Sequence, residues 1–345
     1  MNKTKRHQQI LKLINGTGEY ALTTKELAEQ LDISETTIRR DFQELADAGL
    51  ILRQHGGAVS PRRPPNIVRG DVGVVLVSRG DRYSDPFFNT VLEGADQRLN
   101  ELGYRVSYVK TYFHIETARM AGELLEAQPV DGMLLLGAHR NAEGMDYLRQ
   151  NVRCLTAAID DIDPQLDIVS FDGFNGMRKI VTHLAKLGRK RLGFIAGVKD
   201  HRYDGFLSTV RDLGLPDDPA LHLEIDYGLD GWLPEMGEKG AACLMALDTP
   251  PDAIVCASDR VAIGAMRWLH NQGHRIPADI AVTGFDNIQE ADFTFPPLTT
   301  VHVHKFHIGR LAAERVVRRI ENPDEIPLRI TTPTSLVVRK SCGTP

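Results

Sequence analysis

The sequence of 345 residues has few of the features that mark membrane, secreted or metal-binding proteins. Its four cysteines stand far apart and form no CxxC pair, so neither a zinc ribbon nor a disulfide framework is expected. No apolar run approaches the roughly 18 residues that a membrane span needs. The first nine residues lack the apolar core of a signal peptide. We therefore expect a soluble, cytoplasmic protein that does not enter a membrane.

The sequence also lacks the signature motifs of several enzyme classes. No P-loop, GxGxxG, GxSxG or HExxH pattern occurs, so nucleotide, acyl-transfer and metalloprotease chemistry have no support. The aspartates described below could serve a hydrolase or phosphatase, but no base stands at a recognisable spacing from them. We expect neither enzyme activity nor a cofactor.

Charge is divided unevenly along the chain, although the net charge is only −5. Residues 1–65 carry ten Lys and Arg against eight Asp and Glu, whereas the other residues carry 31 against 38. A slightly basic head on an acidic body is typical of a nucleic-acid-binding module joined to a part with another role. Between them stand three prolines within five residues, so residues 61–70 are expected to form an extended linker.

The head, residues 1–60, is predicted to hold three short helices and a small hairpin. Glycines at 16 and 18 end the first helix. A capping box then opens the second, in which the Thr23 hydroxyl can accept from the Glu26 amide while the Glu26 side chain reaches back. A tight turn at residues 32–34 leads to the third helix, for which Ser34 is a natural N-cap. Two short helices joined in this way allow the second of them to lie in the DNA major groove.

The third helix has one buried face and one polar face. Ile38, Phe42 and Leu45 fall at helical spacing and predict the buried stripe. The polar side chains left facing outward include Thr36, Thr37, Arg39 and Arg40. Arginine can donate two hydrogen bonds to guanine or contact phosphate, and the hairpin at residues 50–59 can touch the DNA backbone as a wing. On this pattern alone, a protein-interaction module with a solvated, charged face stays an alternative.

Specific motifs of the head decide between these alternatives. They are the run at residues 34–42 with its Arg-Arg-Asp triplet, the later Leu45 and Gly49, and the His55-Gly56-Gly57-Ala58 wing. In these motifs, residues 5–60 resemble the winged helix-turn-helix of DeoR-type bacterial repressors. The resemblance implies DNA binding and suggests that Asp41 orients neighbouring side chains. The residues expected at the DNA are Ser34, Thr36, Thr37, Arg39, Arg40 and His55.

The body, residues 71–342, alternates apolar strands with amphipathic helices. Residues 72–77 form a continuous apolar run, as a strand buried on both faces should. Further strands are predicted at residues 104–108, 132–136, 192–196, 253–257 and 280–283. This alternation predicts an α/β fold with parallel sheets covered by helices on both faces. The length favours two lobes, and we expect these to be residues 71–160 plus 300–342, and residues 161–299.

Polar and aromatic residues follow the predicted strands, where open parallel sheets bind their ligands. Examples are Asp85 with Phe88, Asp160, and Asp286. Carboxylates can accept hydrogen bonds from the hydroxyl groups of a sugar, and aromatic side chains can stack on the C–H faces of the sugar ring. A polyhydroxylated ligand is therefore expected. The alternative is that these aspartates cap the helices that follow them, and at Asp259 capping competes strongly with ligand contact.

Several stretches of the body resemble the effector domain of LacI/GalR-type regulators, which shares its fold with periplasmic sugar-binding proteins. The stretches are residues 202–206, 257–265, 276–287, 297–301 and 336–339. The resemblance covers about residues 71–342 and implies a two-lobed domain that binds a small effector and forms the dimer. Helices at residues 87–102 and 117–127 are the candidate dimer contacts.

The same resemblance predicts the effector pocket. Its expected residues are Asp85, Phe88, His139, Asp160, Arg202, Trp232, Ser258 and Asp286. Two positions depart from the family: Ser258 stands where Asn is frequent, and Val303 where Gln is frequent. The ligand therefore need not be a familiar hexose. The family's own helix-turn-helix and hinge helix are replaced by the different head and the Pro-Arg linker.

A metal site is not expected. His302, His304 and His307 stand close together, but no carboxylate or cysteine completes the set nearby. A transport protein would share the body but would need a secretion signal and no DNA-binding head.

The sequence as a whole predicts a ligand-responsive transcriptional regulator that acts as a homodimer on a pseudo-palindromic double-stranded DNA operator. We expect a repressor of carbohydrate uptake or catabolism genes that is relieved by a small sugar or sugar derivative. The alternatives are an activator, or a regulator that senses a non-sugar or phosphorylated metabolite.

Overall fold

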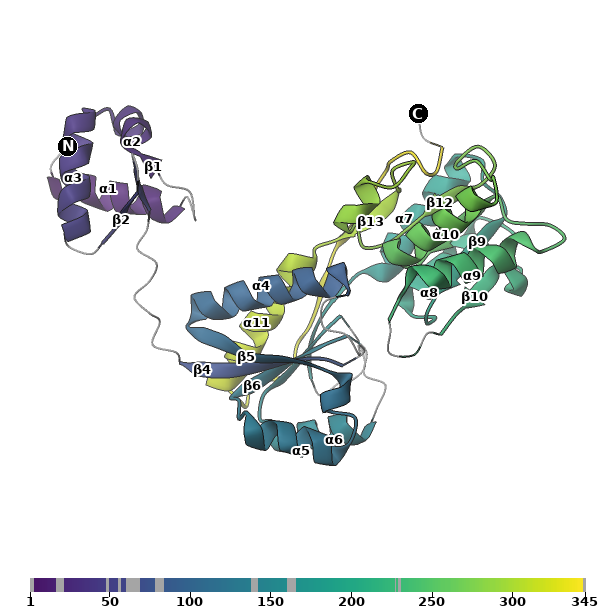
Figure 1. Ribbon diagram of the computed structural model, residues 1–345, viewed down its shortest axis with the longest axis horizontal. Coiled ribbons are helices and arrows are strands. Elements are labelled where there is room, and N and C mark those ends of the chain that lie inside the picture. Colours follow the sequence, from purple (N-terminus) through teal and green to yellow (C-terminus); the bar gives the residue numbers. More distant parts are fainter. Residues whose placement is uncertain are drawn as a thin grey trace. The chain divides into compact units, whose positions relative to one another are not determined.

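The structure is a computed structural model that describes residues 3–16, 22–47, 50–54, 57–59, 69–77, 84–137, 142–159, 166–226, 228 and 231–343. The chain divides into two compact units, Met1–Arg69 and Gly70–Pro345 (Figure 1). Most of the predicted linker lies outside the described residues. Its last residue, Gly70, already belongs to a strand of the second unit.

The first unit is a small helical domain with a three-stranded sheet. Its elements are α1 (Lys3–Gly16), β1 (Leu22–Thr23), α2 (Thr24–Leu31), α3 (Glu35–Asp47), β2 (Leu52–Gln54) and β3 (Gly57–Val59). The strands are antiparallel in the order β1-β3-β2. The predicted capping box is present, because Thr23 Oγ1 accepts from Glu26 N at 3.2 Å and Glu26 Oε2 accepts from Thr23 N at 2.8 Å. The predicted stripe of Ile38, Phe42 and Leu45 is buried in the core of this unit.

The second unit begins with a six-stranded parallel sheet, which defines the first lobe. Its strands are β4 (Gly70–Leu76), β5 (Tyr104–Thr111), β6 (Gly132–Leu136), β7 (Leu155–Ala158), β8 (Asp167–Phe171) and β14 (Arg329–Thr332), in the order β14-β8-β7-β6-β4-β5. One face is covered by α4 (Pro86–Leu102) and α11 (Lys305–Glu321), and the other by α5 (Ala118–Ala127) and α6 (Ala142–Asn151) (Figure 1). The helices α4 and α11 approach closely because each has a glycine against the backbone of the other. A Cβ at Gly94 in α4 would lie 2.0 Å from the Phe306 carbonyl oxygen, and one at Gly309 in α11 would lie 1.9 Å from the Val91 carbonyl oxygen.

The first lobe extends further along the chain than the sequence predicted. The boundary was expected at residue 160, but β8 lies beyond it and pairs with β7 on one side and β14 on the other. The chain thus adds one more strand to the first sheet before it crosses to the second lobe.

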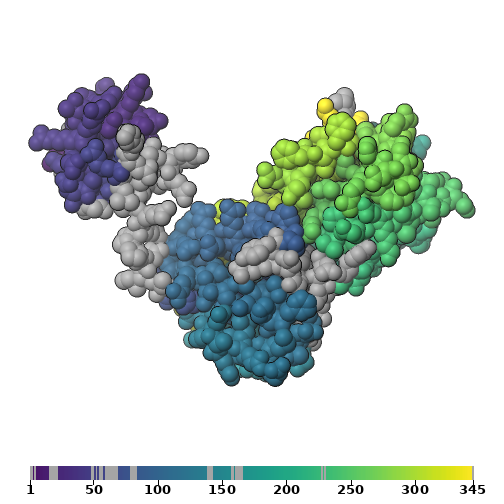
Figure 2. All heavy atoms as spheres, in the orientation of Figure 1, coloured from purple at the N-terminus to yellow at the C-terminus, as the bar shows by residue number. Residues whose placement is uncertain are grey.

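The second lobe is built on a four-stranded parallel sheet. Its strands are β9 (Leu192–Ala196), β10 (His222–Glu224), β11 (Ala253–Cys256) and β12 (Ala281–Thr283), in the order β10-β9-β11-β12. Its helices are α7 (Gly173–Lys186), α8 (His201–Asp212), α9 (Pro234–Met245) and α10 (Asp259–Asn271). Short 3-10 turns stand at Tyr112–His114, Pro219–Leu221 and Gln289–Asp292. In Figure 2 the blue residues of the first lobe and the green residues of the second form two adjoining masses.

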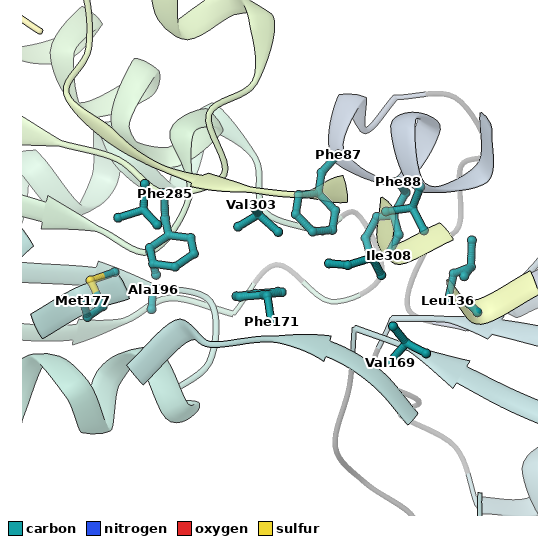
Figure 3. Packing of buried hydrophobic residues seen from close by; sticks show 14 of the residues in the cluster. Phe87, Phe88, Leu136, Val169, Phe171, Met177, Ala196, Phe285, Val303 and Ile308 are labelled. Carbon is teal, nitrogen blue, oxygen red and sulfur yellow. The ribbon is translucent and has the colours of Figure 1, made fainter. Parts of the chain in front are cut away.

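The two lobes are joined by crossover segments and share one apolar core. The strands β13 (Thr300–Val303) and β15 (Thr334–Val337) pair antiparallel where the chain returns to the first lobe. Between the lobes lies a row of rings, with Phe171 at 6.2 Å from Phe87 and 5.7 Å from Phe285, centroid to centroid (Figure 3). One continuous cluster therefore supports residues from both lobes. Among the described helices, each is too short or too polar to cross a bilayer.

Candidate functional site

The helix α3 presents a polar, exposed face at its start. Thr37 N donates to Ser34 Oγ at 3.3 Å, so Ser34 caps the helix as the sequence predicted. Thr36 is exposed and Thr37 half-buried. The Arg39 side chain is 65% exposed and 3.5 Å from Glu35, and Arg40 is 85% exposed and 4.0 Å from Glu44. Such long, solvated ion pairs are weak, so both guanidinium groups can exchange their partner for a phosphate or a base.

Asp41 has a different role from its two arginine neighbours. Its carboxylate is buried and accepts from Arg6 Nη2 at 2.9 Å and from His7 Nε2 at 3.0 Å. Burial pushes the pKa of Asp41 upward, but the hydrogen bonds from Arg6 and His7 outweigh it and hold the pKa below its usual value. The carboxylate thus ties α3 to α1 inside the head and holds the polar face in place. The wing residue His55 lies outside the described residues.

At the first lobe, the candidate effector site begins at the N-terminus of α4. Asp85 is the N-cap of this helix, because its Oδ1 accepts from Phe87 N at 3.0 Å. The capping role considered from the sequence is therefore real at Asp85. Phe88 is buried and packs in the shared core (Figure 3). His139 and Asp160, both predicted for the pocket, lie outside the described residues.

Arg202 in the first turn of α8 is held from three sides. Its Nε donates to Asp200 Oδ2 at 3.0 Å, its Nη1 donates to the Ala257 carbonyl at 2.9 Å, and its guanidinium lies 4.0 Å above the Trp232 ring. The sequence predicted Arg202 and Trp232 as pocket residues, and the structure brings them into direct contact. Sequence reasoning missed Asp200, whose position two residues before Arg202, at the N-cap of α8, was the available signal.

Ser258 and Asp259 follow β11 and divide two tasks between them. Ser258 caps α10, since its Oγ accepts from Val261 N at 3.3 Å. Asp259 is fully buried and accepts from Thr300 Oγ1 at 2.5 Å and from Ile288 N at 2.8 Å. Burial raises the pKa of Asp259 to about 7, against these two hydrogen bonds. Asp259 thus links the start of α10 to Ile288 and to Thr300 at the start of β13, and Ser258 is the residue that caps the helix.

Asp286 lies three residues after the end of β12, in the segment that leads to β13. Its backbone φ is 108°, and that of Asn287 is 52°. Both angles are positive, and residues other than glycine rarely adopt positive φ angles. Lys305, which the sequence did not single out, stabilises this turn. Its Nζ donates to the backbone carbonyl oxygens of Asp286 and of Asn287, the latter at 3.1 Å. Residues held in such conformations cluster at functional sites.

The Asp286 carboxyl is electrostatically linked to both lobes. Burial, and then the nearby Asp259 carboxyl, raises the pKa of Asp286 well above its usual value. The charges of Arg202 and Lys305 act downward, and the charge of Asp85 acts upward. Asp85 at the N-terminus of α4, Arg202 in α8, Asp259 in α10 and Lys305 in α11 therefore all act on the Asp286 carboxyl, and the raised pKa shifts this carboxyl toward the form that can donate as well as accept a hydrogen bond.

The histidines weighed as a metal site have other contacts. His302 Nδ1 lies 3.1 Å from Asn287 Nδ2, and its ring meets His304 edge-on at 4.7 Å. Among the described residues, the one group close enough to share a metal ion is His7, Asp41 and Glu44. Its carboxylates are already bound to Arg6 and Lys3.

Comparison with known proteins identifies both parts of the chain. Residues 6–63 match the DeoR-like helix-turn-helix domain, and residues 181–342 match the periplasmic binding protein-like domain. The chain is 28% identical over 339 residues to the HTH-type transcriptional repressor PurR of Pasteurella multocida, covering 92% of this chain and 98% of that protein. It is also 28% identical over 308 residues to the repressor CytR of Escherichia coli K12, covering 85% and 88%.

Solved structures agree with these matches. The CelR–cellobiose complex of a transcriptional regulator superposes with a TM-score of 0.71 and 25% identity, covering 93% of this chain and 99% of that one. A LacI regulator from Bacillus cereus shares the fold at a TM-score of 0.72, covering 79% and 98%. These relatives are regulators and not enzymes. The chain is therefore a transcriptional regulator in which a DeoR-like helix-turn-helix domain precedes a periplasmic binding protein-like domain.

Proposed function

We propose that the protein represses genes of carbohydrate uptake or catabolism, and that a small sugar or sugar derivative bound between the lobes changes its affinity for DNA. One observation carries this proposal: the Arg202 guanidinium, stacked on Trp232, shares a site with the buried carboxyls of Asp85 and Asp286. Donors, acceptors and a flat apolar ring are the groups that a polyhydroxylated ligand requires. The similar regulator CelR was solved as a complex with cellobiose.

Within this proposal each residue has a distinct task. Arg202 donates to ligand hydroxyls, and the carboxyl groups of Asp85 and Asp286 accept from them. Trp232 supplies the ring face, and Ser258 holds the edge of the site at the start of α10. The remaining expected contacts are Phe88, His139 and Asp160.

The ligand acts by joining groups from two lobes. Asp85 belongs to the first lobe and Arg202 to the second, so a ligand that touches both favours one arrangement of the lobes over others. In a homodimer, this arrangement sets the spacing of the two heads on a pseudo-palindromic operator. A coupling free energy of about 1–3 kcal/mol would change DNA affinity about 5–150-fold. The helices α4 and α5 are the proposed dimer contacts.

The test is a DNA-binding titration with the full chain. Fluorescence anisotropy of labelled DNA from upstream of its own gene would be recorded first against salt and then against single sugars. We expect saturable binding that weakens with salt, as phosphate contacts require, and a change in affinity with at least one sugar. Saturable DNA binding that no sugar or sugar derivative alters would contradict the carbohydrate part of the proposal. Tighter DNA binding with the sugar would contradict relief of repression.

A further inference from the structure

Arg260 lies in the first turn of α10 and has an unusual hydrogen-bonding state. The side chain is only 17% exposed, and its Nη1 is buried with no hydrogen-bond acceptor among the residues that the structure describes. Within the described part of the chain, the carboxylate oxygen paired with this nitrogen is Asp85 Oδ2, at 3.9 Å, which is beyond hydrogen-bond distance. Buried donors are nearly always paired in native proteins, and an unpaired one is costly. The guanidinium is therefore placed to take an acceptor that the described chain does not supply.

The position of Arg260 puts it in the effector site. It follows Ser258, the cap of α10, and stands three residues after Ala257, whose carbonyl accepts from Arg202. Its neighbour Asp85 belongs to the opposite lobe, and the charge of Asp85 also acts on the carboxyl of Asp286. Arg260 thus borders the same space as Arg202, from the same edge of the second sheet.

The two guanidinium groups differ in how their charge is balanced. Arg202 donates to Asp200 through Nε and Nη2, so its charge is matched within α8. Among the described residues, none accepts such a bond from Arg260 Nη1, and the Asp85 carboxylate beside it also accepts from the N-terminus of α4. Asp85 thus gives Arg260 an ion pair but no hydrogen bond, and an acidic group of a ligand would supply the acceptor that Nη1 lacks together with a second negative charge.

We infer that Arg260 binds an acidic group of the effector, so that the effector is a sugar bearing a carboxylate or a phosphate and not a neutral sugar. Guanidinium groups bind carboxylate and phosphate oxygens in the same two-pronged geometry. This inference rests on the proposed carbohydrate function and specifies the chemical class of its ligand. It adds Arg260 to the pocket residues as the determinant of that class.

The first experiment compares matched ligands by isothermal titration calorimetry on the full chain. The probes are glucose, galactose, mannose, ribose and arabinose, each beside its uronic or aldonic acid and its phosphate. We expect an acidic member to bind at least about tenfold more tightly than its neutral parent, the size of one charge-assisted hydrogen bond. Preference for the carboxylate or for the phosphate within that set identifies which acid the site takes. A neutral sugar that binds as well as its acids would overturn the inference but leave the carbohydrate function standing, whereas no binding by any probe would contradict both.

The second experiment changes the guanidinium itself. Arg260→Gln should weaken binding of the acidic ligand at least about tenfold more than binding of its neutral parent, and Arg260→Lys should recover part of the loss because it keeps the charge. The matched control is Arg267→Gln on the same helix, where the arginine is half-exposed and bound to Glu238. Circular dichroism and DNA binding verify folding. If Arg260→Gln does not fold, the salt dependence of the wild-type affinity tests the inference instead. The affinity for an acidic ligand that pairs with Arg260 must fall as salt is added, whereas the affinity for a neutral ligand must not. Unchanged affinity for the acid in folded Arg260→Gln would overturn the inference.

Discussion

Arginine is used in opposite ways in the two units of the chain. In the head, Arg39 and Arg40 are mostly exposed, and their carboxylate partners lie 3.5 and 4.0 Å away. In the body, the Arg202 side chain is 11% exposed, donates to Asp200 and to a carbonyl, and stacks on Trp232. An exposed guanidinium can adapt to a long polyanion, whereas a fixed one can select the shape of a small ligand.

Carboxylates show the same contrast. Asp41 in the head is buried beside two basic side chains, and its pKa lies below the usual value. Asp286 in the body is buried near another carboxyl, and its pKa lies well above the usual value. Burial raises the pKa of both residues; hydrogen bonds from two basic side chains outweigh it at Asp41, whereas the charges of Arg202 and Lys305 do not outweigh burial and the Asp259 carboxyl at Asp286. The head thus keeps its buried carboxylate ionised, and burial in the body shifts the Asp286 carboxyl toward its protonated form.

The largest expected effect comes from removing the fixed arginine. Arg202→Ala removes donors to the ligand and leaves Asp200 without its partner, so effector affinity should fall at least about a hundredfold. DNA binding should persist, because the head folds around its own core. Anisotropy with and without effector measures both properties in one sample.

The matched control for this change is Arg211→Ala on the same helix, where the side chain is exposed and pairs with Asp217. It should respond to effector like the wild type. If the alanine variant unfolds the second lobe, Arg202→Lys keeps a charge beside Asp200 but cannot reproduce the fork. A full effector response in either folded Arg202 variant would remove Arg202 from the pocket.

Local features of this comparison were predictable from the sequence. The capping box of Thr23 and Glu26 and the cap at Ser34 depend on residues three apart, and the structure contains both. The stripe of Ile38, Phe42 and Leu45 follows from helical periodicity alone. Such features need no knowledge of the rest of the chain.

Features that depend on distant residues were missed. The strand β8 follows the same local pattern as other buried strands, but its partner β14 lies about 160 residues later, so spacing could not assign it to a lobe. Arg260 meets Asp85 across 175 positions, and Lys305 reaches back to the turn at Asp286. These contacts arise only when the crossover has brought the two lobes together.

The second effect concerns the buried carboxylate of the head. Asp41→Asn keeps the shape but loses the charge that holds Arg6 and His7, so the head should lose about 2 kcal/mol of stability. Hydrogen exchange of the α1 and α3 amides in the full chain measures this locally. The control is Asp47→Asn, an exposed residue of α3 that accepts from Gln43. Equal protection in both variants would show that the Asp41 cluster does not stabilise the head.

The third effect tests the exposed arginines. Arg39→Ala should weaken operator binding about tenfold and lower the slope of affinity against salt by about one unit if the contact is to phosphate. Effector affinity should stay unchanged. Arg119→Ala is the control, because this arginine is also exposed and paired with a glutamate four residues away, but belongs to α5. A loss of affinity as large in the control as in Arg39→Ala would point to net charge and not to α3.

The smallest effect is a difference in pH dependence between the units. In the body, burial raises the pKa of Asp259 to about 7 from an ordinary value of 3.8. Between these values the folded state keeps a proton that the unfolded state has released. The free energy of unfolding of the body should therefore decrease as pH rises through this window, by about 1 kcal/mol per pH unit. The head should behave in the opposite way, because the low pKa of Asp41 gives stability at neutral pH that is lost in acid below about pH 4.

Asp259→Asn isolates this effect in the body. The amide keeps an oxygen for Thr300 or Ile288 but cannot ionise, and it removes one charge that raises the pKa of Asp286. The unfolding temperature of the body, followed from pH 5 to 7.5 in the full chain, should therefore change less with pH than in the wild type. Asp248→Asn, at an exposed position of the same lobe, should leave the profile unchanged. Parallel profiles for wild type and Asp259→Asn would mean that Asp259 stays ionised in the folded body, and the contrast between the buried carboxyls of the two units would then rest on Asp286 alone.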